Sequence, residues 1–383
     1  MILSLILSCV ARTPSDDPFL YDVDINVDYA IEYTEPTWVV PSSNLPQGVN
    51  PMASNNNVEI VFHDGLLFMA WRSAPTHFAS ADTIMYIMSS RDMGKSWDYE
   101  HEIAISTDVR EPRFLSFRGR LQFAYFEAGD NPGAFEPKHL WRIFRTESGW
   151  STPEVFLDEE SVMWDWKVRN DVAYMTTYDG AHYSEGSVFV RFWESNDGLE
   201  WKKVENKDFV YEGGVSEVAF EFDIDGGLWA VGRNEDGDET GAGSQVCFAS
   251  AQALSDWRCL EESDPERYDS PEMFRHGKNI YLLGRRDIGG TFGPEGDLLA
   301  YSFRAKGFAL YRVNTEVPSV EHIMDLPGAG DTSFPSVHRL SAHEFFLSNY
   351  TSPLDHPDVT WFDGQTSERG TQIYTTILRF IPQ

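Results

Sequence analysis

Residues 58–72 read VEIVFHDGLLFMAWR, an apolar run, a turn containing Asp-Gly, and a second apolar run. Runs rich in β-branched and aromatic residues on both sides of such a turn are typical of paired β-strands. The same pattern returns at 111–127, 163–179, 216–233, 271–286 and 334–350. Six copies at a period of roughly 50 residues, each able to supply four strands, favour a propeller.

Tryptophans support the period. Trp97, Trp150, Trp201 and Trp257 each close a short turn-rich segment between successive copies. We therefore predict an all-β, six-bladed β-propeller with four-stranded antiparallel blades. The last copy lacks an outermost strand, and residues 37–40 are predicted to supply it and close the ring, since an open ring would leave unpaired edges. The alternative is a five-bladed ring with an extra sheet.

The N-terminal residues differ from the rest. Residues 1–9 read MILSLILSC, an apolar run ending in a small residue and Cys9. This resembles a bacterial lipoprotein signal, in which Cys9 is lipidated; the other interpretation is a truncated secretion signal with an incidental cysteine. We predict a signal-like segment and linker at 1–17, a propeller at 18–383, and export to the periplasm, the outer membrane or the outside of the cell.

Charge and composition restrict the partners. The chain has 30 Lys+Arg against 61 Asp+Glu, a net charge of −31, which disfavours nucleic acid and anionic membranes. Membrane contact is expected only through an N-terminal lipid. Cys247 and Cys259 are either a disulfide or two buried thiols. We expect no cofactor and no metal, because the sequence has no motif for either, and we expect a monomer.

Two turns carry a recognisable pattern. SRDMGKSW at 90–97 fits S-x-D-x-G-x-x-W, and SNDGLEW at 195–201 fits a version one residue shorter. Together with the period, these turns resemble the sialidase superfamily, also called the Asp-box or BNR-repeat proteins. The resemblance implies an active site on the propeller axis. It would contain three arginines for the substrate carboxylate, a Tyr nucleophile assisted by a Glu, and an Asp acid/base.

The resemblance assigns roles to residues on repeats four and five. Glu217 begins the first strand of repeat four and Arg233 ends the next, an arrangement similar to the family's Glu and second arginine. Arg304 resembles the third arginine. Arg285 and Arg286 are either pocket residues or, as we expect, a solvated pair that compensates nearby acids.

Repeat one supplies the remaining matches. Arg72 resembles the arginine that lines the pocket beside the acid/base loop. Asp82, in the loop before the first Asp box, is the candidate acid/base, and His77 in the same loop is a second candidate.

Two family positions are missing. Asn56, Asn57, Val58 and Glu59 stand where the first arginine motif is expected, and the stretch GAGDTSF at 328–334 has no tyrosine at the nucleophile position. Asp331 either replaces the nucleophile or caps a turn, while Tyr350 at the end of the next strand could approach the axis. With these changes the site would prefer a smaller charge or a neutral sugar.

Acidic residues recur where the inner strands begin. They could point into an axial cleft, and we predict Glu59 and Glu272 among them as substrate-binding residues. The set is Glu59, Glu111, Asp165, Glu217, Glu272 and Asp331.

The sequence predicts an exported sialidase-like glycoside hydrolase that cleaves a glycan in the axial pocket, with true sialidase activity not expected. Arg233 and Arg304 would hold the substrate, while Asp82 and Glu217 would carry the acid/base chemistry. One alternative is a non-catalytic surface propeller that binds glycans or proteins. Another is a polysaccharide lyase, which would use His77 with Tyr178 or Tyr350.

Overall fold

The computed structural model describes residues 22–157 and 160–383. They form six antiparallel sheets whose innermost strands contact one another in a closed circle, β3 to β7, β12, β17, β21, β25 and back to β3. The predicted six-bladed propeller is therefore confirmed. The segment 1–17 with Cys9 lies outside the described residues, so that boundary stays a prediction. Nowhere in the described ranges is a helix long and apolar enough to span a membrane.

The first three blades follow the chain from the axis outward. Blade 1 comprises β3 (Ser54–His63), β4 (Leu66–Ala74), β5 (Ile84–Ser90) and β6 (Asp98–Ile103). Blade 2 comprises β7 (Val109–Phe117), β8 (Arg120–Ala128), β9 (Pro137–Thr146) and the short outer pieces β10 (Gly149–Trp150) and β11 (Glu154–Val155). Blade 3 comprises β12 (Val162–Arg169), β13 (Val172–Gly180), β14 (Val188–Ser195) and the outer pieces β15 (Lys202–Lys203) and β16 (Tyr211–Gly213).

The other three blades complete the circle. Blade 4 comprises β17 (Val215–Phe222), β18 (Leu228–Asp238), β19 (Gly241–Ala249) and β20 (Arg258–Cys259). Blade 5 comprises β21 (Glu272–His276), β22 (Asn279–Asp287), β23 (Lys306–Asn314) and β24 (Ser319–Leu326). Blade 6 comprises β25 (Ser336–Arg339), β26 (Glu344–Thr351), β27 (Gln372–Pro382) and the N-terminal strands β1 (Tyr29–Tyr33) and β2 (Thr37–Val40).

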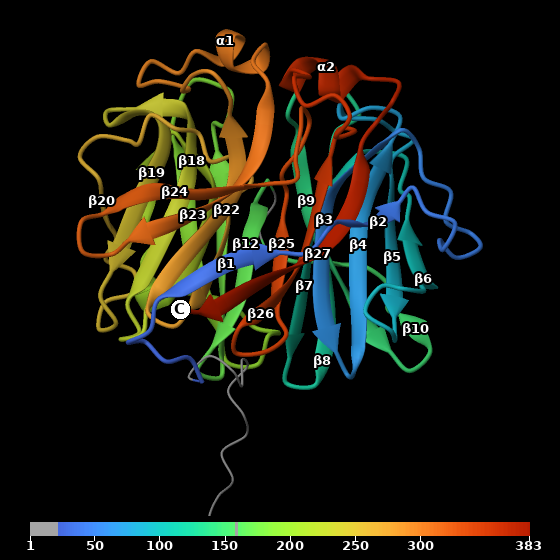
Figure 1. Cartoon of the computed structure of the whole chain (residues 1–383), viewed down its shortest axis with the longest axis horizontal. Helices are drawn as coiled ribbons and strands as arrows, with labels where there is room; N and C mark the ends of the chain where they lie inside the picture. Colours follow the sequence, from blue (N-terminus) through green and yellow to red (C-terminus); the bar gives the residue numbers. More distant parts are fainter. Residues whose placement is uncertain (1–21, 158–159) are drawn as a thin grey trace, which may run out of the picture.

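The N-terminal strands close the ring. Thr37 of β2 pairs with Thr375 of β27, as predicted, and β1 adds a second antiparallel pairing along the same strand. Figure 1 shows the blue β1 running beside the red β27. The N-terminal strands β1 and β2 and the C-terminal strand β27 thus pair within one sheet, which joins the circle.

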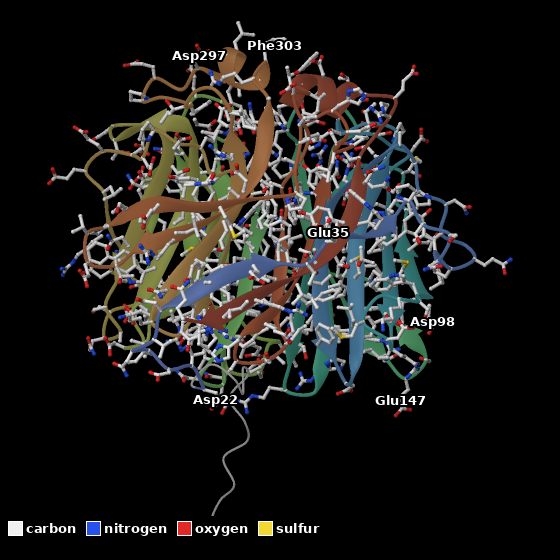
Figure 2. The ribbon with its side chains drawn as sticks, in the orientation of Figure 1. Asp22, Glu35, Asp98, Glu147, Asp297 and Phe303 are labelled. Atoms are coloured by element: carbon white, nitrogen blue, oxygen red, sulfur yellow. A yellow bond between two sulfur atoms is a disulfide. The ribbon has the colours of Figure 1, made fainter. Side chains whose placement is uncertain are left out.

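Short helices and a disulfide complete the structure. The elements are η1 (Val204–Asn206), α1 (Leu298–Ser302) and α2 (Trp361–Thr366), and α1 and α2 lie together at one end of the molecule (Figure 1). Cys247 and Cys259 form a disulfide between β19 and β20. Apolar side chains fill the space between the sheets, while acids such as Asp98, Glu147 and Asp297 lie exposed on the periphery (Figure 2).

A backbone irregularity recurs where the inner strands begin. β-Bulges interrupt the pairing of β3, β7, β12 and β17 with their neighbours. In five blades a non-glycine residue at this place has a positive φ, an unfavourable conformation that redirects a side chain. These residues are Asn57, Glu111, Glu217, Ser270 and Ser333. In these five blades the bulge therefore directs one residue towards a common region around the axis.

Blade 3 has Trp164 at the equivalent place, and its side chain crosses the axis. The indole Nε1 donates to the carbonyl of Pro271 in blade 5 (3.0 Å), and the ring lies 5.3 Å from that of Phe334 in blade 6. The Arg113 guanidinium lies over both rings, 5.0 and 4.5 Å from their centres. These contacts link blades 2, 3, 5 and 6 across the axis.

Candidate active site

Glu217 and Arg233 meet at one end of the axis. Ser216 of β17 pairs in register with Arg233 of β18, and the bulge at Glu217 turns its carboxylate towards the guanidinium, 2.9 Å away. Its other oxygen accepts a hydrogen bond from the backbone N–H of Ser270 (3.0 Å). Burial raises the pKa of Glu217 to about 7, against the opposing effect of Arg233 and with further help from Asp269 and other carboxylates. The group can therefore carry a proton near neutral pH.

A second carboxylate, Asp269, gathers three arginines. Arg267 Nε lies 2.5 Å from one oxygen, Arg285 Nη1 lies 2.6 Å from the other, and Arg233 Nη1 is 3.8 Å away. The Tyr301 hydroxyl donates to the same carboxylate at 2.5 Å. Asp269 is completely buried. The arginines come from β18, the loop before β21, and β22, so the cluster joins blades 4 and 5.

His77, Asp331 and Tyr350 form the neighbouring group. His77 Nδ1 lies 2.8 Å from one oxygen of Asp331, and the Tyr350 hydroxyl donates to the other at 3.0 Å. Burial alone would raise the pKa of Asp331, but His77, Arg285 and Tyr350 together hold it below its usual value. Because Asp331 is then ionised, the 2.8 Å contact fixes the proton of neutral His77 on Nδ1 and leaves the Nε2 lone pair available.

The loop that carries His77 is fixed from beneath by Arg72. This guanidinium is completely buried, donates to Asp108 (2.8 Å), and also donates to the carbonyls of Thr76 (3.4 Å) and Phe78 (2.9 Å). Substrate cannot reach a side chain with no exposed surface. The structure therefore corrects the predicted substrate contact: Arg72 positions the loop.

Two other predicted residues lie away from these contacts. Arg304 pairs with Asp287 (2.8 Å) and Asp82 lies exposed in the turn between β4 and β5. The place expected for Arg304 beside Arg233 is taken by Arg285, whose expected solvation is also wrong. On β22 successive side chains point to opposite faces, so Arg285 is buried while Arg286 pairs with Asp325 near the surface.

Asn56 lies in the stretch 56–59, where the resemblance led us to expect the first arginine. Its amide is completely buried and contacts Ser54 (3.1 Å), Arg72 (3.3 Å) and His77 (3.3 Å). Asn56 Oδ1 accepts from Arg72, so Asn56 supports the guanidinium that fixes the loop.

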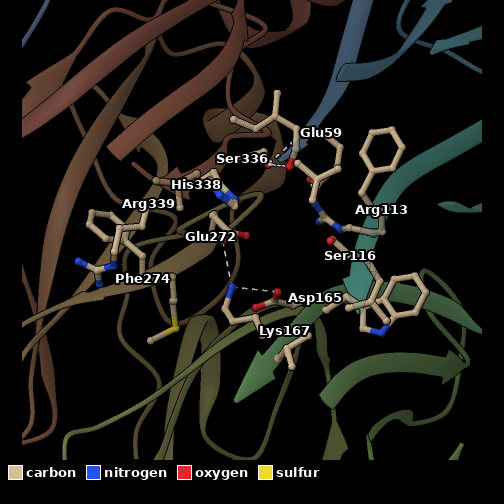
Figure 3. A pocket seen from close by; sticks show the side chains of 18 of the residues that line it. Glu59, Arg113, Ser116, Asp165, Lys167, Glu272, Phe274, Ser336, His338 and Arg339 are labelled. Atoms are coloured by element: carbon tan, nitrogen blue, oxygen red, sulfur yellow. Dashed lines mark hydrogen bonds and ion pairs between the residues drawn. The ribbon is translucent and has the colours of Figure 1, made fainter. Parts of the chain in front are cut away.

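Glu59 and Glu272 belong to the other end of the axis. Lys167 Nζ lies 3.0 Å from both Asp165 and Glu272, and Arg113 lies 3.0 Å from Glu59. These groups line a pocket of about 340 Å³, with His338 and Arg339 on its wall (Figure 3). Glu217 is not among the residues that line this pocket. The predicted substrate-binding roles of Glu59 and Glu272 in the same site as Glu217 therefore do not agree with the structure.

The buried carboxyl of Glu272 gives stability a measurable pH dependence. Burial raises its pKa to about 8, opposed by Lys167 and assisted by Asp165 and Glu59. A folded-state pKa above the unfolded value means that the stabilisation is complete below about pH 4.5 and is lost as pH rises through 8. In the wild type, Glu272 should therefore lower the free energy of unfolding by up to about 1.4 kcal/mol per pH unit between pH 5 and 8. The Glu272→Gln variant does not titrate there, so urea unfolding should show that this contribution to the pH dependence is gone.

The matched control is Glu344→Gln, which alters an exposed pair with Arg379. An unchanged slope in the Glu272→Gln variant would contradict the assignment of the raised pKa to Glu272.

Comparisons with known proteins show the fold. No family model and no curated protein sequence matches the chain. Among solved structures, a protein of unknown function from Dyadobacter fermentans has a TM-score of 0.61 at 14% identity, covering 91% of this chain and 99% of that one. The phage phi92 endosialidase has a TM-score of 0.57 at 11% identity, covering 94% and 70%. Trypanosoma rangeli sialidase in complex with sialic acid has a TM-score of 0.54 at 14% identity, covering 86% and 54%.

The chain is thus a distant sialidase-like six-bladed propeller, and it spans little more than half the length of the trypanosome sialidase. Within the described ranges, no group of three His, Cys, Asp or Glu side chains is arranged to hold a metal ion.

Proposed function

We propose that the protein is a glycoside hydrolase that acts on a glycan at the Glu217 end of the propeller axis. The carrying observation is the geometry at Glu217: a strained bulge holds this carboxyl against Arg233 in a buried setting that raises its pKa to about 7, so that a protonated fraction exists near neutral pH. A protonated carboxyl can donate its proton to the leaving glycosidic oxygen. The sialidase-like fold supports a glycan as the partner.

His77 takes the role of general base in this proposal. Asp331 orients the imidazole, in the way that a buried carboxylate orients a catalytic histidine, and leaves Nε2 able to accept a proton from water. The His77 side chain is 19% exposed, whereas Asp331 is completely buried. Asp331 is therefore proposed as the residue that positions the base, and water would attack the sugar directly.

Tyr350 serves as a hydrogen-bond donor to Asp331 in this proposal and has no role as a nucleophile. Burial, with the Asp331 charge, raises the pKa of Tyr350 well above its usual value, so the phenol keeps its proton. It donates that proton in a hydrogen bond to Asp331. Inverting hydrolysis by Glu217 and His77 requires no covalent intermediate on Tyr350.

The proposal is tested with the full chain and a panel of aryl glycosides and natural oligosaccharides with neutral and acidic terminal sugars. We expect release of a sugar with inverted anomeric configuration, followed by NMR. The His77→Ala variant should lose about 100-fold or more of the rate, and His77→Asn should not restore it. Bound glycan with no product across the panel and a pH series would overturn the hydrolase proposal.

A specific observation favours the rival function, a non-catalytic glycan-binding propeller. Arg233 is only 9% exposed and already contacts Glu217, Glu235 and Asp269. Charges that are paired with one another keep the surface rigid, and a rigid surface can bind a glycan without carrying out chemistry on it. Binding on a glycan array without cleavage would establish this function instead.

Export is a separate proposal. A disulfide persists in oxidising compartments, so the Cys247–Cys259 bond supports it, together with the apolar N-terminal run. Detection of the mature protein outside the cytoplasm, with or without a lipid on Cys9, would test it.

A further inference from the structure

The Asp269 side chain is surrounded by arginines in the way that a bound carboxylate ligand would be. Three guanidinium groups and one phenol converge on its two oxygens, and each comes from a different segment of blades 4 and 5. Arg267 and Asp269 are completely buried, and Arg285 is nearly so. Converging arginine forks are the arrangement that proteins use to bind a carboxylate, because each fork can donate two hydrogen bonds.

Aromatic rings close the outer side of this cluster. The Trp361 ring of α2 lies 5.0 Å from the Arg285 guanidinium and 5.6 Å from that of Arg267. Phe292 lies 4.9 Å from Arg267. Cation–π contacts and the exclusion of water strengthen the attraction between the arginines and Asp269. The carboxylate is held from within the fold and has no solvent-exposed surface.

The filled site is directly beside the proposed proton donor. Ser270 follows Asp269 in the chain, and its backbone N–H donates to Glu217 at 3.0 Å. The Asp269 carbonyl accepts the backbone N–H of Arg285 at 3.0 Å. Residues 269–270 therefore supply both the carboxylate that the arginines bind and one hydrogen bond to Glu217.

Charge balance limits what else the cluster can hold. Arg233, Arg267 and Arg285 face the carboxyls of Asp269, Glu235 and Glu217; Glu235 lies 2.7 Å from Arg267 and 3.2 Å from Arg233. When Glu217 carries its proton, Asp269 and Glu235 are the two remaining carboxylates, and each of the three arginines already lies within 4 Å of at least one of them. A substrate carboxylate here would meet Asp269 and Glu235 at close range, which is repulsive.

We propose that Asp269 is an internal carboxylate ligand that permanently fills an arginine site, so that the adjacent site accepts sugars without a carboxylate and rejects sugar acids. This rests on the proposed function for its substrate, but the filled arginine site itself can be tested without any glycan.

The binding test uses the full-chain Asp269→Ala variant, in which the three arginines lose their ligand. Sodium acetate at ten times its Kd should raise the Tm of this variant by about 2 °C over sodium chloride of the same ionic strength. The wild type should show no such difference. Neither should the matched control Asp325→Ala, which removes the partner of the exposed Arg286.

If Asp269→Ala does not fold in chloride, the readout becomes refolding yield in formate or acetate against chloride, measured by circular dichroism. Recovery that is specific for these carboxylates supports the internal-ligand proposal. Equal yields in all three salts, or an acetate effect of the same size in the wild type, would overturn it.

Selectivity is measured separately on the wild type. Paired substrates that differ only by a carboxylate on the terminal sugar should be hydrolysed with kcat/KM at least tenfold higher for the neutral member. A preference for the acidic member would overturn the specificity proposal and leave the hydrolase proposal standing. Hydrolysis of neither member would contradict the hydrolase proposal, while acetate rescue of Asp269→Ala would still support the filled arginine site.

Discussion

Glu217→Gln is expected to lower kcat for glycan hydrolysis by about 100- to 10,000-fold, the usual contribution of a general acid. Glutamine matches the shape of the protonated carboxyl and can still accept the hydrogen bond from Ser270. It has no dissociable proton to give to the leaving oxygen. Initial rates on the best substrate of the panel, with circular dichroism to show that the fold persists, provide the measurement.

The pH profile distinguishes proton donation from a structural effect. Since the pKa of Glu217 is about 7 and the protonated form is active, the wild-type rate should fall on the alkaline side with an apparent pKa near 7. The residual activity of Glu217→Gln should lack this fall. The exposed variant Glu344→Gln should keep both the rate and the profile. A Glu217→Gln rate within tenfold of the wild type would contradict the assigned role.

Much of the fold could be predicted because it depends on a repeated local signal. Each apolar–turn–apolar segment forms the two inner strands of one blade, for example 58–72 within β3 and β4. The closing strand was also predictable, because the sixth copy lacked a partner that 37–40 could provide. β1 carries a weaker pattern, and its pairing with β27 follows from the length of β27, which extends beyond β2.

The candidate site was predictable only where it lies on regular strands. Glu217 and Arg233 belong to adjacent strands in register, so their separation in the sequence indicates their contact. Arg267 and Asp269 lie in an irregular segment between blades, where no periodicity indicates direction. The signal that could have found Arg285 is strand alternation, since it makes one member of the Arg285–Arg286 pair face inward.

The acidic residues at the strand starts show why composition alone was insufficient. Residues on the bulges, such as Glu111 and Glu217, have a positive φ, whereas Glu59 and Glu272 each follow such a residue by two positions. The first group is directed to one end of the axis and the second lines the pocket at the other. A two-residue difference relative to a bulge therefore decides which end of the axis a carboxylate serves, and bulges leave little trace in a single sequence.

Trp164→Ala is expected to lower the free energy of unfolding by about 3–5 kcal/mol, the range for removing a large aromatic side chain from a packed interior. Three contacts across the ring disappear together: the hydrogen bond to Pro271, the edge-to-face packing on Phe334 and the cation–π contact with Arg113. Because these contacts join blade 3 to blades 5, 6 and 2, the loss weakens the circle. Urea unfolding monitored by circular dichroism measures the change.

Two further variants locate the source of that loss. Trp164→Phe keeps a ring beside Phe334 but removes the indole N–H. It should therefore destabilise the protein less than Trp164→Ala, because most of the packing remains. The loss that is left, about 1–3 kcal/mol, would come from the unpaired Pro271 carbonyl. Trp38 is 37% exposed on β2, and Trp38→Ala should cost about 1 kcal/mol or less. If Trp164→Ala cost no more than Trp38→Ala, the contacts of Trp164 across the axis would add nothing to stability beyond ordinary surface burial.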